Sequence, residues 1–280
     1  EAIDFGVTLF DTADCYGNGL SEERLGKALG PRRRDVLIST KFGVRIGQDG
    51  ATFIDNDPRW IVNAVEGSLR RLGTEAIDIY QIHWWDGRTP FSAIFETLER
   101  LVDAGKIRAY GSTNVTLDMM GLASADPLPA NFISTSMEFS LVQAKGREAI
   151  QAMCRGGGRQ LHFLAWGSLG GGILTGKYTS AADLDPKDRR LKRADSHFTG
   201  ERLQRNLGIV GLCRSIAAAH GPHVTVAQVA LQWIGRTLGF GTCLVGIKSL
   251  PQLAEAVASF DFRLTDAEVR NLDEAAATPC

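Results

Sequence analysis

The sequence predicts an α/β fold, a (β/α)8 barrel of the TIM type in which seven of the eight strands are visible. Short β-branched or apolar runs alternate with amphipathic stretches, which is typical of parallel strands joined by right-handed helical crossovers. Polar and charged residues follow many of these runs, as they do where a site is built at the carboxyl ends of barrel strands. The first strand is not followed by a GxGxxG turn, which disfavours an open dinucleotide-binding sheet.

Seven strands are expected, each a short run between turn residues. They are VTLFDTA (7–13), DVLISTK (35–41), IDIYQIH (77–83), IRAYGST (107–113), FISTSME (132–138), LHFLAWG (161–167) and CLVGI (243–247). A barrel needs eight strands, so the missing one is expected before residue 1. The chain is therefore expected to be a single barrel domain over residues 1–280, truncated at its N-terminus. Open sheet edges would make it less stable than a longer chain, or inactive.

Helices are expected where apolar residues recur at 3.6-residue spacing. Ser21 is the expected N-cap of the first helix, and Asp57-Pro58 opens the second. A third helix is expected over 91–104, ended by Gly105. Later helices are expected at 224–239, 249–258 and 264–276, after a long loop over 167–200.

Composition limits the classes of function. A net charge of −1 gives no overall attraction to nucleic acid or to a membrane, and no apolar run approaches the ~18 residues of a membrane span. Five cysteines without a CxxC pair favour a reducing, cytoplasmic location and argue against disulfides. No HxH or carboxylate cluster follows a strand, so no metal site is expected and a metal-dependent barrel hydrolase is disfavoured.

The turn FDTADCYG (10–17) carries two carboxylates, a thiol and a phenol, although a turn needs only small or polar residues. Lys41 and His83 stand at the ends of the next two strand candidates. Taken singly, each residue could have a purely structural role. Asp11 could cap a helix, Tyr16 could pack half-buried, Lys41 could be a solvated residue at a strand end, and His83 could be a hydrogen-bonded core residue. The other two turn residues are expected to be a solvated carboxylate, Asp14, and a bystander thiol, Cys15.

These segments, in this order, resemble the aldo-keto reductase family of bacterial type. The family motif DTAxxYG matches residues 11–17, its strand-end lysine matches Lys41, and its HWP-like segment matches His83-Trp84. The resemblance continues through SLRRLGTEAIDIYQIHW (68–84), GKIRAYGSTN (105–114), LAWGSLGGGILTGKY (164–178) and LVGIKSLPQLAEA (244–256). It covers nearly the whole chain but not the family's first barrel strand. It implies an oxidoreductase that reduces an aldehyde or ketone to an alcohol by hydride transfer from NADPH rather than NADH.

The chemistry of carbonyl reduction agrees with this resemblance. Hydride transfer builds negative charge on the carbonyl oxygen, so a nearby acid must donate a proton. Tyr16 can be that acid, Lys41 can lower the pKa of its phenol, and Asp11 can hold Lys41 in place. His83 can donate a hydrogen bond that orients the carbonyl. The hydride must come from a cofactor, because no side chain can deliver one.

The resemblance also implies the cofactor contacts, carried over one residue at a time. Thr113 and Asn114 match the pair that holds the nicotinamide amide, and Ser136 stands where the family usually has Gln. Trp166 matches the aromatic residue that stacks on the nicotinamide ring. The remaining matches, for the phosphates and adenosine, are Gly167, Ser168, Leu169, Gly170, Gly172, Gly246, Lys248, Ser249 and Gln252. Basic residues within 177–193 suggest a flap over the pyrophosphate or a solvated loop.

The expected partner is a small carbonyl substrate in an open pocket lined by Trp84, Trp85 and Tyr16. No nucleic acid or membrane partner is expected, and the oligomeric state is left open. Two alternatives remain. One is a cofactor-binding regulatory or partner-binding subunit, because GGxLTGKY also resembles the β subunits of potassium channels. The other is an inactive truncated homologue.

Overall fold

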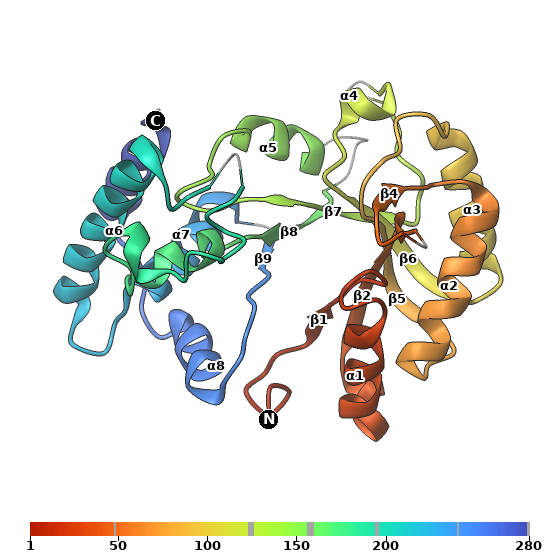
Figure 1. Cartoon of the computed structure of the whole chain (residues 1–280), viewed down its shortest axis with the longest axis horizontal. Coiled ribbons are helices and arrows are strands. Elements are labelled where there is room, and N and C mark those ends of the chain that lie inside the picture. Colours follow the sequence, from red (N-terminus) through yellow and green to blue (C-terminus); the bar gives the residue numbers. More distant parts are fainter. Residues whose placement is uncertain (48, 123–125, 156–159, 194–195, 240, 279–280) are drawn as a thin grey trace. The chain divides into compact units, whose positions relative to one another are not determined.

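The computed structural model describes residues 1–47, 49–122, 126–155, 160–193, 196–239 and 241–278 (Figure 1). The chain divides into two compact units. The first unit comprises Glu1–Met137 and Ala149–Phe163, and the second comprises Glu138–Glu148 and Leu164–Cys280.

The predicted parallel sheet is present. Its strands are β1 (Leu9–Asp11), β2 (Leu37–Phe42), β5 (Ile77–Ile82), β6 (Ile107–Thr113), β7 (Phe132–Glu138), β8 (His162–Trp166) and β9 (Gly241–Cys243), in that order across the sheet. The four neighbouring pairs from β1 to β7 are parallel, which confirms the alternating pattern. The described residues supply seven strands to this sheet, and the closed eight-stranded barrel stays a prediction.

Helices connect the strands of the first unit. They are α1 (Leu20–Leu29), α2 (Pro58–Leu72), α3 (Phe91–Asp103), α4 (Leu117–Met120) and most of α5 (Arg147–Arg155), with a 3-10 turn, η1 (Gly30–Asp35), before β2. Helix α1 packs against α2, and α2 packs against α3 (Figure 1). Their apolar faces and the strands form one core, which includes Ile38, Phe42, Val65, Tyr80, Ile94, Tyr110 and Phe132.

The two predicted helix starts in this unit have different outcomes. Asp57 caps α2 as expected, because its carboxylate accepts the backbone N–H of Arg59 at 2.8 Å. Ser21 is not the N-cap of α1, so that prediction was wrong. The helix begins two residues earlier than expected, after Gly19, whose φ of 91° is easily adopted only by glycine. The Ser21 hydroxyl instead accepts a hydrogen bond from Thr12 at 2.8 Å.

A short antiparallel hairpin follows β2 and was not predicted. It consists of β3 (Val44–Ile46) and β4 (Thr52–Ile54). Arg45 on this hairpin pairs with Asp55 at 2.6 Å and lies over the ring of Trp60, with 3.9 Å between guanidinium carbon and ring centroid. Three-residue strands are too short for an alternating pattern to stand out in the sequence.

The second unit contains the C-terminal helices α6 (Gly200–His220), α7 (Val226–Leu238), α8 (Leu250–Val257) and α9 (Asp266–Ala277). Helix α6 packs against α7 and α9, and α7 also contacts α8 and β9. The predicted helices at 224–239, 249–258 and 264–276 are confirmed, whereas α6 was not predicted. Strand β9 lies earlier than the run expected at 243–247. Leu244, which follows it, donates its backbone N–H to the Ala165 carbonyl at 2.8 Å.

The long segment predicted as a loop over 167–200 contains two 3-10 turns among its described residues. They are η2 (Gly170–Thr175) and η3 (Ala181–Asp183). A third, η4 (Ala258–Phe260), follows α8. Among the described residues, no helix is both long enough and apolar enough to cross a membrane.

Candidate active site

Strands β1 and β2 bring a buried ion pair to their carboxyl ends. Their parallel register places Asp11 opposite Ser39, two residues before Lys41. The ammonium of Lys41 lies 2.5 Å from Asp11 Oδ2 and donates a second hydrogen bond to the carbonyl of Thr12 at 2.7 Å. Lys41 is only 2 % exposed, so these two acceptors replace its contact with water. The predicted contact between Asp11 and Lys41 is therefore present.

Tyr16 stands on the turn after β1, beside this ion pair. Its ring centroid lies 5.3 Å from the Lys41 ammonium, and the ring meets that of His83 edge-on at 5.7 Å. Loss of hydration and the Asp11 carboxylate together raise the pKa of the Tyr16 phenol above its usual value. The expectation that this pKa is lowered is therefore not met, because loss of hydration, the largest cause, and the Asp11 carboxylate both raise it.

His83 follows β5 and is buried. Burial and the nearby Lys41 ammonium lower the pKa of its imidazole to about 3, so the ring is neutral at physiological pH. Cys15 Sγ lies 3.6 Å from His83 Nδ1. Burial and Asp14 raise the pKa of the Cys15 thiol to about 11, so the thiol keeps its proton. A neutral imidazole with one nitrogen occupied in this way can offer a proton from the other.

A chain of hydrogen bonds joins the ion pair to β6, and we call it the Asp11–Thr113 relay. Thr113 Oγ1 lies 3.3 Å from Gln81 Oε1, and Gln81 Nε2 donates to Ser39 Oγ at 2.7 Å. Ser39 Oγ donates to Asp11 Oδ1 at 2.9 Å. Ser39 and Gln81 are 0 % exposed. Neither residue was predicted from the sequence, because only the register of four neighbouring strands reveals these contacts.

Asp14 was expected to be a solvated turn residue, and that expectation was wrong. One carboxylate oxygen is buried without a hydrogen-bond partner among the described residues. Burial, with a further contribution from Glu22, raises the pKa of Asp14 to about 7. Glu22 is itself fully buried, but Arg71 at 2.7 Å and Thr40 at 2.6 Å satisfy it. We assign the two carboxylates Asp14 and Glu22 to the packing of α1 and the turn before it, and not to the catalytic chemistry.

The three nicotinamide candidates of the first unit lie close together. Asn114 follows β6 with a φ of 59°, a left-handed conformation that asparagine tolerates better than most residues. Its backbone N–H donates to the Ser136 carbonyl at 2.8 Å, and its side-chain amide donates to the His83 carbonyl at 3.3 Å. Ser136 and Thr113 are buried in β7 and β6. This cluster therefore adjoins His83 through Asn114.

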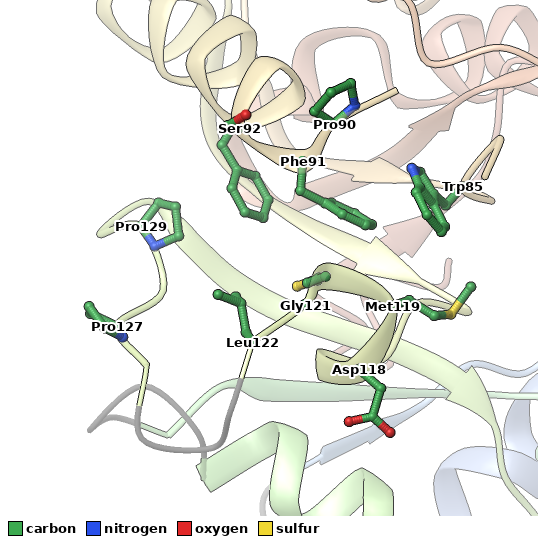
Figure 2. Close-up of a pocket in the computed structure, with 12 residues that line it drawn as sticks. Trp85, Pro90, Phe91, Ser92, Asp118, Met119, Gly121, Leu122, Pro127 and Pro129 are labelled. Carbon is green, nitrogen blue, oxygen red and sulfur yellow. The ribbon is translucent and has the colours of Figure 1, made fainter. Parts of the chain in front are cut away.

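The two tryptophans predicted to line the substrate pocket have different surroundings. Trp84 is 43 % exposed. Trp85 is half-buried, donates from its indole to the Thr89 carbonyl at 2.8 Å, and packs against Phe91 with ring centroids 5.1 Å apart. Trp85 and Phe91 line an apolar pocket of about 600 Å³ between the start of α3 and α4 (Figure 2). None of the residues that line it is Asp11, Tyr16, Lys41 or His83.

In the second unit, the segment after β8 turns tightly on its glycines. Gly171 and Gly172 have φ values of 64° and 101°, which side chains rarely allow. Arg190 braces this turn from the long segment by donating to the Gly171 carbonyl at 2.8 Å. Arg190 also pairs with Asp188 at 2.7 Å. The Ser168 hydroxyl is buried and donates to the Ala165 carbonyl at 2.8 Å, so it already has a partner.

The remaining cofactor candidates gather at the start of α8. Gly246, Lys248 and Ser249 are exposed there, and Ser249 is the N-cap residue of the helix. The Lys248 backbone N–H donates to Gln252 Oε1 at 2.9 Å. No partner of the Lys248 ammonium is found in the described part of the chain. An unpaired cation beside a helix N-terminus suits an anionic group such as phosphate.

A metal ion has no evident site in the described ranges, since no group of three or more His, Cys, Asp or Glu residues is suitably placed. The Lys41 ammonium, held by the Asp11 carboxylate, and the His83 imidazole favour proton transfer and oxyanion stabilisation.

Comparison with known proteins identifies relatives along the whole chain. A sequence model described as "Aldo/keto reductase family" matches residues 1–277, in both units. "Aldo-keto reductase yakc [NADP(+)]" of Schizosaccharomyces pombe is 32% identical, over 98% of this chain and 80% of its own length. "Aldo-keto reductase YhdN" of Bacillus subtilis is 32% identical, over 90% of this chain and 74% of its own. The solved structure of the glycerol dehydrogenase AKR11B4 from Gluconobacter oxydans matches with a TM-score of 0.85 at 28% identity, covering 100% of this chain and 85% of that one.

Proposed function

Because this chain belongs to the aldo/keto reductase family, we propose that it reduces an aldehyde or ketone to an alcohol with NADPH as the hydride donor. The observation that carries the proposal is the arrangement around Lys41. Its buried ammonium pairs with Asp11, and the rings of Tyr16 and His83 lie beside it. Each group can meet one requirement of carbonyl reduction.

We assign the proton donor role to Tyr16. The raised pKa keeps its phenol protonated throughout the physiological range, so the acid is present before reaction. As negative charge grows on the carbonyl oxygen, that oxygen becomes basic enough to take the proton. The Lys41 ammonium then stabilises the phenolate, and Asp11 keeps Lys41 in position. His83, held neutral, donates a hydrogen bond to the carbonyl oxygen and orients it.

Bound NADPH would supply the hydride. The residues of this chain fit such a cofactor, because buried polar groups suit a carboxamide and exposed cationic and backbone groups suit phosphates. In the first unit, Thr113, Asn114 and Ser136 are assigned to the nicotinamide amide, and in the second unit Trp166 is assigned to the nicotinamide ring. The residues assigned to the phosphates and adenosine are Gly167, Ser168, Leu169, Gly170, Gly172, Gly246, Lys248, Ser249 and Gln252.

The relatives support NADPH and a small substrate. The yeast relative is named for NADP(+), and the exposed Lys248 ammonium could meet a ribose phosphate, which NADH lacks. The glycerol dehydrogenase likeness favours small hydroxylated carbonyl compounds among the substrates. We assign Trp84 to the wall of the substrate pocket because it is exposed and follows His83 directly. Trp85 is assigned a weaker role there, since it packs against Phe91.

The proposal is tested by fluorescence titration with NADPH and NADH, followed by turnover on aldehydes, ketones and quinones, with glyceraldehyde included. Binding of NADPH with turnover of at least one carbonyl compound would support the assignment. NADPH binding without turnover of any compound would instead favour a cofactor-binding regulatory protein. Failure to bind either nucleotide would contradict the proposed function altogether.

A further inference from the structure

We propose that Ser39 and Gln81 are positioning residues that make the Thr113 hydroxyl an obligate hydrogen-bond acceptor towards the cofactor, so that the site selects a carboxamide N–H at the nicotinamide. The inference rests on the proposed binding of NADPH. It concerns the Asp11–Thr113 relay, whose members lie on four neighbouring strands of the first unit.

The direction of the relay follows from its charged end. Asp11 is paired with Lys41 at 2.5 Å and, when ionised, can only accept hydrogen bonds. Ser39 must therefore donate its single proton to Asp11 at 2.9 Å. The Ser39 oxygen can then only accept, so the atom of Gln81 that faces it at 2.7 Å must be the amide nitrogen.

Gln81 extends this chain of hydrogen bonds to Thr113. With its amide nitrogen turned to Ser39, Gln81 presents its carbonyl oxygen to Thr113 at 3.3 Å. A carbonyl oxygen cannot donate, so Thr113 must direct its only proton to Gln81. The lone pairs of the Thr113 hydroxyl remain for a ligand. The charge of Asp11 on β1 thus determines that Thr113 on β6 accepts, and does not donate, a hydrogen bond from a ligand.

Burial makes this arrangement selective. Ser39 and Gln81 are 0 % exposed and Thr113 is 2 % exposed, so water cannot easily replace a lost partner. A ligand with an N–H group at Thr113 gains a hydrogen bond. A ligand with only an acceptor or a methyl group at that position cannot hydrogen-bond to the lone pairs of the Thr113 oxygen, and therefore binds more weakly. The nicotinamide carboxamide has the required N–H₂ group, and a 3-acetylpyridine ring lacks it.

The test compares binding of NADP⁺ and of its 3-acetylpyridine analogue, measured by quenching of tryptophan fluorescence without any substrate. One hydrogen bond corresponds to about a 3- to 10-fold preference for NADP⁺ in the unmodified protein. Ser39→Ala and Gln81→Met should each lower the ratio of NADP⁺ affinity to analogue affinity at least threefold. In either variant the Thr113 hydroxyl is no longer held by the relay and can rotate to donate its proton to the ligand. Ser112→Ala is the matched control. It also removes a fully buried hydroxyl from the sheet, but one without a hydrogen-bond partner among the described residues.

A second comparison separates this role from a general loss of packing. In a Thr113→Val background the selecting hydroxyl is already gone, so Ser39→Ala should not change the ratio further. An unchanged ratio in both Ser39→Ala and Gln81→Met would overturn the relay, even if NADPH binding and carbonyl reduction were intact. A ratio lowered equally by Ser112→Ala would also overturn it. If the unmodified protein bound no NADP⁺ at all, the proposed function and the relay would fail together.

Discussion

The thiol of Cys15 lies 3.6 Å from Nδ1 of His83, close enough for a weak S–H···N hydrogen bond. The pKa of the thiol is raised to about 11, so it is protonated and can donate. His83 Nδ1 must then accept, which places the ring proton on Nε2. Cys15 was expected to be a bystander, and from this contact we predict that it helps to position the His83 ring.

Replacing this thiol tests that role. Cys15→Val removes the donor at similar size, so both imidazole tautomers become available and kcat should fall about 2- to 10-fold. Cys15→Ser retains a donor and should retain most of the activity. Nitrogen NMR of labelled histidine should show Nδ1 of His83 unprotonated in the parent protein and a mixture of tautomers in Cys15→Val. Identical His83 spectra in all three proteins would refute the role.

Asp14 makes stability depend on pH in a defined direction. Its pKa is raised from 3.8 to about 7 in the folded protein, so between pH ~4 and 7 the folded state binds more protons than the unfolded state. The free energy of unfolding contributed by Asp14 therefore falls as pH rises through this window. Above pH 7 Asp14 is ionised in both states, and the free energy of unfolding is lowered by the full cost of burying its charge.

Asp14→Asn should remove this cost. We expect the variant to be more stable than the parent by about 1–3 kcal/mol at pH 8, and to differ little at pH 4. Urea unfolding at pH 4, 6 and 8 measures the difference, and the opposite contribution of His83 cancels because both proteins contain it. Asp103→Asn, at an exposed carboxylate, is the control. A difference that did not change with pH would show that Asp14 is not a buried, titrating carboxylate.

Lys248 tests the cofactor preference. Its exposed ammonium lacks a partner in the described part of the chain, so a ribose phosphate can pair with it. NADPH should bind more tightly than NADH by about 10-fold or more, and Lys248→Glu should narrow or reverse that difference. Lys27→Glu, which places the same charge change on the exposed face of α1, should leave it unchanged. Equal affinity of the unmodified protein for the two nucleotides would contradict the assignment.

Periodicity and strand-end chemistry were sufficient to predict much of this molecule. The sequence of β5 to β7 and of the helices α2, α3, α7 and α9 carries clear patterns, and these elements lie near the expected residues. The contact between Asp11 and Lys41 was expected from the resemblance to the aldo-keto reductase family and its chemistry, and the ends of β1 and β2 bring the two residues together. Helix α6 was missed because Gly208 and Gly211 interrupt its pattern and weaken its helix propensity.

Features that depend on register or desolvation could not be predicted in the same way. Ser39 and Gln81 are 42 residues apart, and nothing in either segment shows that their side chains meet. Asp14 looks like an ordinary turn residue, and only its neighbours reveal that one of its oxygens is buried. The raised pKa of Tyr16 likewise depends on its loss of hydration and on the distance to the Asp11 carboxylate, which the sequence does not show.

The measurement that tests the central claim most directly is steady-state turnover of Tyr16→Phe, alongside its affinity for NADPH. This substitution removes the acidic hydroxyl and keeps the ring that packs against His83. NADPH should therefore bind within about twofold of the parent, while kcat falls by ~10²–10⁴-fold, the usual range for loss of a general acid. Near-normal turnover on every accepted carbonyl substrate would show that Tyr16 is not the proton donor.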